Sequence, residues 1–186
     1  MMDKIIMAGF GGQGVMFIGK VLAVAGMNLN LELCWIPSYG PEMRGGTANC
    51  SVLLSDREIY SHVIDQADAV IVLNQPAYEK FSPRVKPNGT LIMNQSLIET
   101  KETNPMINRI AVPATQLASE MGSPGIANMI CLGALIPSLK LLDLPAIEHA
   151  IKKLTVGRPD VMKDNSIAVH KGMAWAMDEN NKPVNC

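Results

Sequence analysis

The hexapeptide Gly-Phe-Gly-Gly-Gln-Gly at residues 9–14 constrains the fold of this chain more than any other segment. It directly follows the apolar run Ile5–Ala8 and precedes an apolar pattern of helical type over residues 15–23. A glycine loop between a strand and a helix lets the backbone turn sharply, so N–H groups at the helix N-terminus can face an anion. We therefore predict a ligand- or partner-binding loop that contains Gly9, Gly11, Gly12, Gln13 and Gly14.

The spacing Gly9-x-Gly11-x-x-Gly14 also satisfies the dinucleotide-binding fingerprint, which needs an acidic residue at the end of the second strand, about 20 residues further on. Glu32 lies near that distance, but the apolar run continues through Leu33–Ile36, so Glu32 is predicted to begin that strand. Three interpretations of the loop remain open. They are a nicotinamide or flavin site, a turn that only packs a helix on a strand, and another ligand or partner surface built on the same turn.

Composition indicates a protein with a full core and few charges. The 186 residues fit one domain, residues 1–186, and 48% of them are apolar while 18% are charged. The formal net charge of −1 argues against a nucleic-acid-binding surface. A surface this poor in charge is unusual for a free monomer, so we expect interfaces with other subunits.

The cysteines and the apolar stretches indicate a cytoplasmic protein without a membrane span. No Cys-x-x-Cys pair occurs, so local spacing predicts neither a zinc site nor an iron–sulfur cluster, and free thiols in a reducing cytosol are expected. The first apolar run is too short for a signal peptide. The most apolar region, residues 126–142, is interrupted by Asn128, Pro137 and Lys140, which excludes an ordinary membrane span. The four cysteines are Cys34, Cys50, Cys131 and Cys186.

Short apolar runs alternate with helical patterns along much of the chain. This alternation predicts an α/β fold, a three-layer α/β/α arrangement with a largely parallel sheet and a Rossmann-like glycine loop after the first strand. A helix is expected from Leu144, with Asp143 as its N-cap and a Glu148–Lys152 pair on one face. The predicted strands are Lys4–Ala8, Leu31–Ile36, Ala48–Leu54, Ala69–Leu73, Thr90–Met93 and Asn108–Val112.

The second and third of these runs are joined by a glycine- and proline-rich connector without a helix. Glu42 and Arg44 stand there between Gly-Pro and Gly-Gly, and a guanidinium can hold a carboxylate or phosphate through two parallel hydrogen bonds. The alternative is an ordinary exposed ion pair. We expect this connector to lie beside the glycine loop, beyond the carboxyl ends of the strands. Its candidate site residues are Tyr39, Gly40, Pro41, Glu42, Arg44, Gly45 and Gly46.

Taken together, these segments identify a family. Gly-Phe-Gly-Gly-Gln-Gly-Val, followed by Ser-Tyr-Gly-Pro-Glu-Met-Arg-Gly-Gly at residues 38–46, resembles the gamma subunit of 2-oxoacid:ferredoxin (acceptor) oxidoreductases, in the pyruvate/ketoisovalerate oxidoreductase family. The form Gly-Pro-Glu-x-Arg-Gly-Gly is most similar to subunits that act on 2-oxoglutarate, with the pyruvate and branched-chain types as alternatives. The similarity extends to residues 67–78, 89–92, 112–115 and 128–135.

The resemblance implies oxidative decarboxylation of a 2-oxoacid to its acyl-CoA, with electrons passed to ferredoxin or a similar carrier. It places thiamine diphosphate, Mg²⁺ and iron–sulfur clusters on alpha, beta and small ferredoxin-like partner subunits, with none bound by this chain alone. It leaves the catalytic residues of this chain unassigned and implies no metal ligand here. Combined with the chemistry of the two loops, it implies a share in the active-site entrance and in receiving coenzyme A. Asn128 would either face the glycine loop or tie two core elements together. An independent Rossmann-type nucleotide-binding oxidoreductase is the other function considered.

Overall fold

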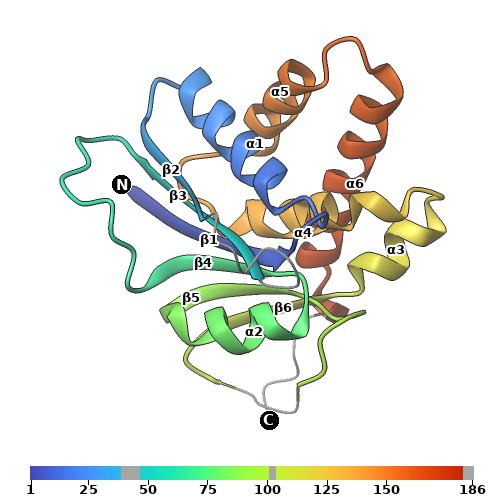
Figure 1. The fold of residues 1–186 in the computed structure, drawn as a ribbon, viewed down its shortest axis with the longest axis horizontal. Coiled ribbons are helices and arrows are strands. Elements are labelled where there is room, and N and C mark those ends of the chain that lie inside the picture. The colour runs from blue at the N-terminus through green and yellow to red at the C-terminus, as the bar shows by residue number, and fades with distance from the viewer. Residues whose placement is uncertain (39–46, 101–103, 182–186) are drawn as a thin grey trace.

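The computed structural model describes residues 1–38, 47–100 and 104–181 (Figure 1). The strands are β1 (Met2–Phe10), β2 (Glu32–Ser38), β3 (Thr47–Ser55), β4 (Ala67–Val72), β5 (Val85–Asn94) and β6 (Asn108–Val112). The helices are α1 (Val15–Asn28), α2 (Gln75–Phe81), α3 (Ala114–Glu120), α4 (Ala127–Leu135), α5 (Leu144–Leu154) and α6 (Pro159–Met177). Short 3-10 turns are η2 (Ser82–Arg84), η3 (Pro124–Ile126), η4 (Ile136–Ser138) and η5 (Glu179–Asn181). Each apolar run predicted as a strand overlaps one of these strands.

The strands form one six-stranded sheet in the order β2-β3-β1-β4-β5-β6. β1, β4, β5 and β6 are mutually parallel, whereas β3 runs antiparallel to both β1 and β2. A parallel neighbour requires a long crossover, and the chain between β2 and β3 is too short to provide one. The sheet is therefore mostly parallel, as expected, with β3 as the one antiparallel strand among the described residues.

Helices cover both faces of the sheet, but unequally. α1 and α3 to α6 pack against one face and form the larger core, which includes Ile18, Ile92 and Ile130. The other face is covered by α2 and by coil segments, around Ile6 and Phe81. Figure 1 shows α2 in front of the sheet and the remaining helices behind or above it. The α/β/α layering predicted from sequence is confirmed, with one thick and one thin helical layer.

Local signals explain several element boundaries. The Asp143 side chain accepts a hydrogen bond from the Ala146 N–H at 3.0 Å and so caps α5, as predicted. Asn74 caps α2 in the same way, through the Ala77 N–H at 2.9 Å. The predicted Glu148–Lys152 pair is wrong, because Glu148 turns to α6 instead.

The helices α4 and α6 cross in close contact through their glycines. A Cβ placed on Gly172 would lie 1.8 Å from the Ile130 carbonyl oxygen, and one placed on Gly133 would lie 2.0 Å from the Val169 carbonyl oxygen. Only a residue without a side chain allows the two backbones to approach this closely. The crossing fixes the last helix of the chain over the centre of the larger core.

A half-buried carboxylate ties three distant segments together at the amino ends of the strands. Asp68 accepts hydrogen bonds from the Lys4 N–H at 3.0 Å, from the Lys140 ammonium at 2.7 Å and from the Lys86 ammonium. Burial opposes the ionised form, but these donors outweigh it, so the pKa of Asp68 lies below its usual value. The same pairing raises the pKa of Lys140.

Asp3 lies nearby and shows the opposite balance. Its side chain is 1% exposed and accepts the N–H groups of Lys140 and Leu141, both at 3.0 Å. Burial is the dominant influence and raises the pKa of Asp3, despite these two donors and the Lys140 ammonium. The two carboxylates together attach the segment before α5 to the first strand.

Candidate functional site: the glycine loop

The glycine loop connects β1 and α1 through a tight turn at the carboxyl edge of the sheet. The Gln13 N–H donates to the Phe10 carbonyl at 3.2 Å, and α1 begins one residue after Gly14. Gly12 and Gly14 have φ angles of 90° and 75°, which is the left-handed region that favours glycine. Gly9 belongs to the end of β1 and is buried, whereas Gly11 and Gly12 are exposed.

Gln13 turns inward and closes the loop onto the neighbouring strand. Its Oε1 accepts from the Phe10 N–H at 2.7 Å and from the Asn74 Nδ2 at 2.8 Å, while its Nε2 donates to the Leu73 carbonyl at 3.4 Å. Asn74 in turn caps α2. The Gln13 amide is thus committed to protein groups and holds the loop in shape, so it does not face outward as a ligand-binding side chain.

Asn128 fixes the other end of the loop. Its Nδ2 donates to the Gly14 carbonyl at 3.2 Å, and the side chain is 5% exposed on α4. A Cβ on Gly14 would lie 2.3 Å from this nitrogen, so glycine is required there for contact as well as for φ. Of the two roles considered from sequence for Asn128, the geometry combines both, since it reaches the loop and joins α4 to α1.

A further amide missed by the sequence reasoning lies at the end of β5. Asn94 is 1% exposed; its Nδ2 donates to Thr115 Oγ1 at 2.9 Å, and its Oδ1 accepts from the Thr115 N–H at 3.3 Å. Asn74 and Asn94 both follow an apolar strand directly, and that position is the signal that could have found them. Asn94 lines a small cavity of about 190 Å³ together with Gln13 and Asn128.

The outward side of the loop borders a different, mainly apolar hollow of about 370 Å³. It lies over the first turn of α1, where Met16 and Phe17 are half-buried. Lys20 is the one charged side chain among the described residues that line it, and its ammonium lies 5.9 Å from the centroid of the Trp35 ring. Together with the positive end of the helix dipole, Lys20 makes this hollow suited to an anion with an apolar part.

The second predicted loop falls outside the described residues. Tyr39, Gly40, Pro41, Glu42, Arg44, Gly45 and Gly46 all lie between the described ranges. The strands that flank the connector are described, and the first residue of β3 pairs with Phe10, the last residue of β1. The end of the connector at β3 therefore lies beside the glycine loop, and the proximity of the two loops stays a prediction.

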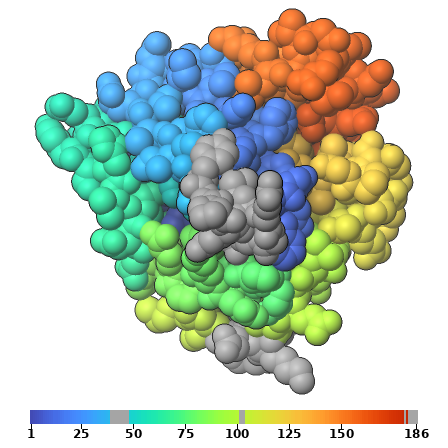
Figure 2. All heavy atoms as spheres, viewed as in Figure 1, coloured from blue at the N-terminus to red at the C-terminus, as the bar shows by residue number. Residues whose placement is uncertain are grey.

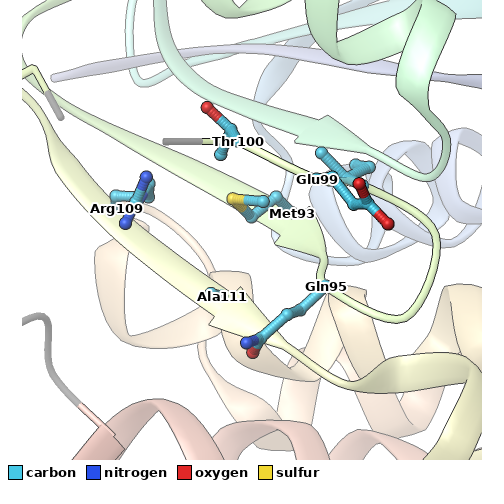
Figure 3. A pocket seen from close by; sticks show the side chains of 7 residues that line it. Met93, Gln95, Glu99, Thr100, Arg109 and Ala111 are labelled. Atoms are coloured by element: carbon cyan, nitrogen blue, oxygen red, sulfur yellow. The ribbon is translucent and has the colours of Figure 1, made fainter. Parts of the chain in front are cut away.

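Two other features of the described residues were candidates for a second site: a hollow on the α2 face and a polar cluster on α5 and α6. Figure 3 shows a hollow of about 560 Å³ on the α2 face, in which Arg109 and Glu99 lie on opposite sides of Met93. On α5 and α6, Ser166 and His170 both contact Glu148, so they lack the serine–histidine contact of a nucleophilic triad.

Metal and membrane signals were also sought in the part of the chain that the structure describes. It contains no group of three or more His, Cys, Asp or Glu side chains that could hold a metal ion. Burial raises the pKa of Cys50 to about 11 and that of Cys131 to about 12, so both thiols keep their protons at neutral pH. Across residues 1–38, 47–100 and 104–181, no helix combines the length and apolar character needed to cross a bilayer.

The sheet order argues against a dinucleotide site of the usual kind. In that site the acidic residue ends the strand next to the one that precedes the glycine loop. Here β3 separates β2 from β1, and Glu32 is the first residue of β2, as predicted, at the far end from the loop. No carboxylate of β2 can therefore take the ribose-binding position beside the glycine loop.

Comparison with known proteins decides the family. Residues 4–175 match the pyruvate ferredoxin/flavodoxin oxidoreductase family. The chain belongs to this family. The match extends from β1 into α6, which agrees with the resemblance drawn from the two glycine-rich segments and the later motifs.

Members of the pyruvate ferredoxin/flavodoxin oxidoreductase family differ in length. Subunit VorA of ketoisovalerate oxidoreductase from Methanothermobacter thermautotrophicus is 31% identical over 94% of this chain, which spans only 36% of VorA. Subunit KorC of 2-oxoglutarate synthase from Methanothermobacter marburgensis is 31% identical over 96% of this chain and 98% of KorC. The same fold therefore occurs both as a separate chain and as about a third of a longer one.

A solved structure shares the fold closely. The 2-oxoglutarate:ferredoxin oxidoreductase from Magnetococcus marinus, with 2-oxoglutarate, coenzyme A and succinyl-CoA bound, matches with a TM-score of 0.84 and 27% identity. The match covers 94% of this chain and 31% of that one. This likeness supports the α/β arrangement described above.

Proposed function

We propose that this chain is the gamma subunit of a cytoplasmic, multi-subunit 2-oxoacid:ferredoxin oxidoreductase and that it helps to receive coenzyme A. The observation that carries the proposal is the glycine loop, held from within by Gln13 and Asn128 while its outward side borders a hollow with Lys20. Family membership and the full-length similarity to KorC support the subunit assignment. The coenzyme A bound in the Magnetococcus marinus enzyme supports the ligand.

The proposed share of this chain is binding rather than chemistry. Coenzyme A combines phosphates with a long, less polar arm. Its phosphates would contact the N–H groups at the start of α1 and the Lys20 ammonium, while Phe10 and Phe17 offer apolar contact. Arg44 and Glu42, together with the rest of the 39–46 connector, would complete this entrance against a partner subunit, as the sequence pattern suggests. The described residues provide no nucleophile or general base at the loop.

Thiamine diphosphate, Mg²⁺ and the iron–sulfur clusters are proposed to reside on alpha, beta and small ferredoxin-like subunits. The described residues do not fit these groups, because no cluster of metal-binding side chains is present and the buried thiols hold their protons. Ferredoxin or a similar carrier would take the electrons from those subunits. This chain would then be inactive when isolated.

For the substrate we propose 2-oxoglutarate, from the Gly-Pro-Glu-x-Arg-Gly-Gly pattern and the KorC relatives. The VorA relatives and a pyruvate synthase subunit PorC make branched-chain 2-oxoacids and pyruvate the competing choices. Comparing kcat/KM of the assembled complex for the three substrate types distinguishes them. A higher value for pyruvate or 3-methyl-2-oxobutanoate than for 2-oxoglutarate would overturn this choice.

Replacing Lys20 with alanine in the assembled complex tests the coenzyme A contact. The KM for coenzyme A should rise about tenfold, equivalent to about 1.4 kcal/mol, with little change in kcat, because the lost contact serves binding. Lys80→Ala is the matched control, since Lys80 is also exposed and lies 5.6 Å from the centroid of the Phe81 ring. Equal KM values in Lys20→Ala and Lys80→Ala would remove Lys20 from the coenzyme A site.

The alternative, an independent nucleotide-binding oxidoreductase, predicts that the isolated chain binds a cofactor. It requires binding of NAD(H) or FAD, for which β2 supplies no ribose-binding carboxylate beside the loop. Calorimetry of the isolated chain should detect no NAD(H) binding at micromolar concentrations.

A further inference from the structure

Lys20 carries the positive charge of the hollow outside the glycine loop, and its ammonium ends a long, flexible stem. The residue is exposed. An exposed lysine side chain samples many rotamers, so holding its ammonium in one place for a ligand costs conformational entropy. The strength with which Lys20 binds an anion therefore depends on whether a neighbouring group already restricts its side chain.

The indole ring of Trp35 on β2 is such a neighbour. The Lys20 ammonium lies over this ring, 5.9 Å from its centroid. The ring is half-buried and packs against the larger core, and the described residues that line the hollow do not include Trp35. Figure 2 shows the surface of α1 in blue beside that of β2 in lighter blue. Trp35 thus contacts the charged group of the hollow without lining the hollow itself.

Gly19, the residue before Lys20, makes room for the indole against α1. A Cβ placed on Gly19 would lie 2.7 Å from Trp35 Nε1 and 2.8 Å from Cys50 Sγ. Any residue with a side chain would have to displace one of these groups, so glycine lets the ring lie this close to the helix. Trp35 Nε1 and Cys50 are both buried. The indole is therefore fixed along its nitrogen edge by the core, while Lys20 lies over its ring.

We propose that Trp35 is a positioning residue, whose indole ring holds the Lys20 ammonium at the hollow for a phosphate group of coenzyme A. This inference rests on the proposed function. An aromatic face attracts an ammonium group electrostatically, which restricts Lys20 before the ligand arrives and reduces the free energy lost in ordering it. The ammonium has three N–H donors, and those that point away from the ring stay available to phosphate oxygens.

A double-variant cycle in the assembled complex tests the role of Trp35. Trp35→Leu should raise the KM for coenzyme A about threefold with little change in kcat, which is the effect of losing a cation–π contact at an exposed site. In a Lys20→Ala background the same change should leave this KM unaltered, because the group that Trp35 positions is gone. Trp35→Phe keeps an aromatic face and should raise the KM less than Trp35→Leu does.

Trp175→Leu is the matched control, because it removes another half-buried indole. Trp175 Nε1 donates to the Ala111 carbonyl at 2.9 Å, and the residue lies on α6, away from the hollow. This variant should leave the KM for coenzyme A unchanged. Trp35→Met fills part of the indole volume without an aromatic face, and it replaces Trp35→Leu in the cycle if that variant does not assemble.

The outcomes separate this inference from the proposed function. If Lys20→Ala raises the KM for coenzyme A but Trp35→Leu does not, the positioning role of Trp35 is wrong and the coenzyme A contact stands. An equal rise for Trp35→Leu with and without the Lys20 side chain would also overturn the inference, since the indole would then act through packing alone. An unchanged KM in Lys20→Ala would instead remove the proposed coenzyme A contact, and the role of Trp35 with it.

Discussion

The glycine loop owes its shape to single contacts between amides and backbone carbonyls. The Gln13 amide donates to the Leu73 carbonyl at the end of the neighbouring strand, and the Asn128 amide donates to the Gly14 carbonyl at the end of the loop. A loop held in this way is already in its binding conformation, so a ligand would lose little free energy in ordering it. The residue that couples the loop to the core is Gly14, which faces Asn128.

Replacing Gly14 with alanine should therefore be more damaging than the same change at Gly12. Both positions have positive φ, which costs a residue with a Cβ about 1–2 kcal/mol. Only Gly14 also meets a side chain, Asn128 Nδ2 at 2.3 Å, whereas nothing lies within 4 Å of a Cβ at Gly12. Urea unfolding should show a loss for Gly14→Ala that exceeds that for Gly12→Ala by about 1 kcal/mol or more.

A double variant isolates that contact. Asn128→Ala removes the amide that a Cβ on Gly14 would meet, so adding Gly14→Ala to it should cost no more than the backbone strain seen in Gly12→Ala. If the losses in the free energy of unfolding of the two single variants add fully in the double variant, the loop instead moves away from α4 at no cost in stability.

Residue-scale prediction from sequence succeeded where the signal was local. The Asp143 cap and the position of Glu32 at the start of its strand depend on neighbours within a few residues, so pattern alone was sufficient. The inward turn of Gln13 depends on Asn74, which lies 61 residues away, and no local pattern carries that information. The failed Glu148–Lys152 pair has the same cause, since α6 offered Glu148 closer partners.

At the scale of elements, the tightest joint is the crossing of α4 and α6. Glycine inside a helix normally costs about 0.5–1 kcal/mol relative to alanine. Here the close packing that Gly133 and Gly172 allow between the two helix backbones offsets that cost. Two residues that are individually unfavourable in a helix thereby allow α6 to pack tightly on α4.

The substitution Gly172→Ala should reverse the usual helix preference. Its Cβ would meet the Ile130 carbonyl oxygen and the Ala134 nitrogen, which are backbone atoms that cannot rotate away. We expect a loss of about 3 kcal/mol or more in the free energy of unfolding, beyond the ordinary cost of overpacking. Gly125→Ala is the control, since a Cβ there meets nothing within 4 Å, and it should change stability by less than about 0.5 kcal/mol. A stabilised Gly172→Ala variant would show that the helices are not in such contact.

Sequence patterns located the strands because the apolar runs of the central strands β1, β4 and β5 are buried on both sides of the sheet. The reversal of β3 was implicit in the connector without a helix, although the expectation was stated only as a largely parallel sheet. The unequal helical layers were not foreseeable. They depend on which face of the sheet each crossover helix covers. Apolar spacing predicts that a helix is buried but not against which face it packs.

For the molecule as a whole, Asp3 and Asp68 make stability depend on pH in opposite directions. The pKa of Asp68 lies below its ordinary value of 3.8, so Asp68 stabilises the fold above that pH and loses this contribution as pH falls through its folded-state pKa. The pKa of Asp3 lies above 3.8, so its contribution weakens as pH rises from 3.8 through its folded-state pKa.

Asparagine substitutions separate the two carboxylates. Asp68→Asn should lower the free energy of unfolding by about 1–3 kcal/mol at pH 7. This loss relative to the wild type should shrink as the pH falls below 3.8. For Asp3→Asn, the free energy of unfolding of the variant should instead increase relative to that of the wild type as the pH rises above 3.8. Free energies of unfolding measured by urea titration across this range provide the check, and parallel pH profiles for the two variants would contradict the assignment.

The link between Asp3 and Lys140 also sets a condition on how the protein is made. These residues are 137 positions apart, so at a synthesis rate of about 5–20 residues per second the first strand waits roughly 7–27 s for this partner. Meanwhile Ile5, which ends up fully buried in the larger core, has left the ribosome before the helices α4 and α6 that complete this core. We therefore expect the nascent chain to need protection from aggregation until Gly172 has left the ribosome.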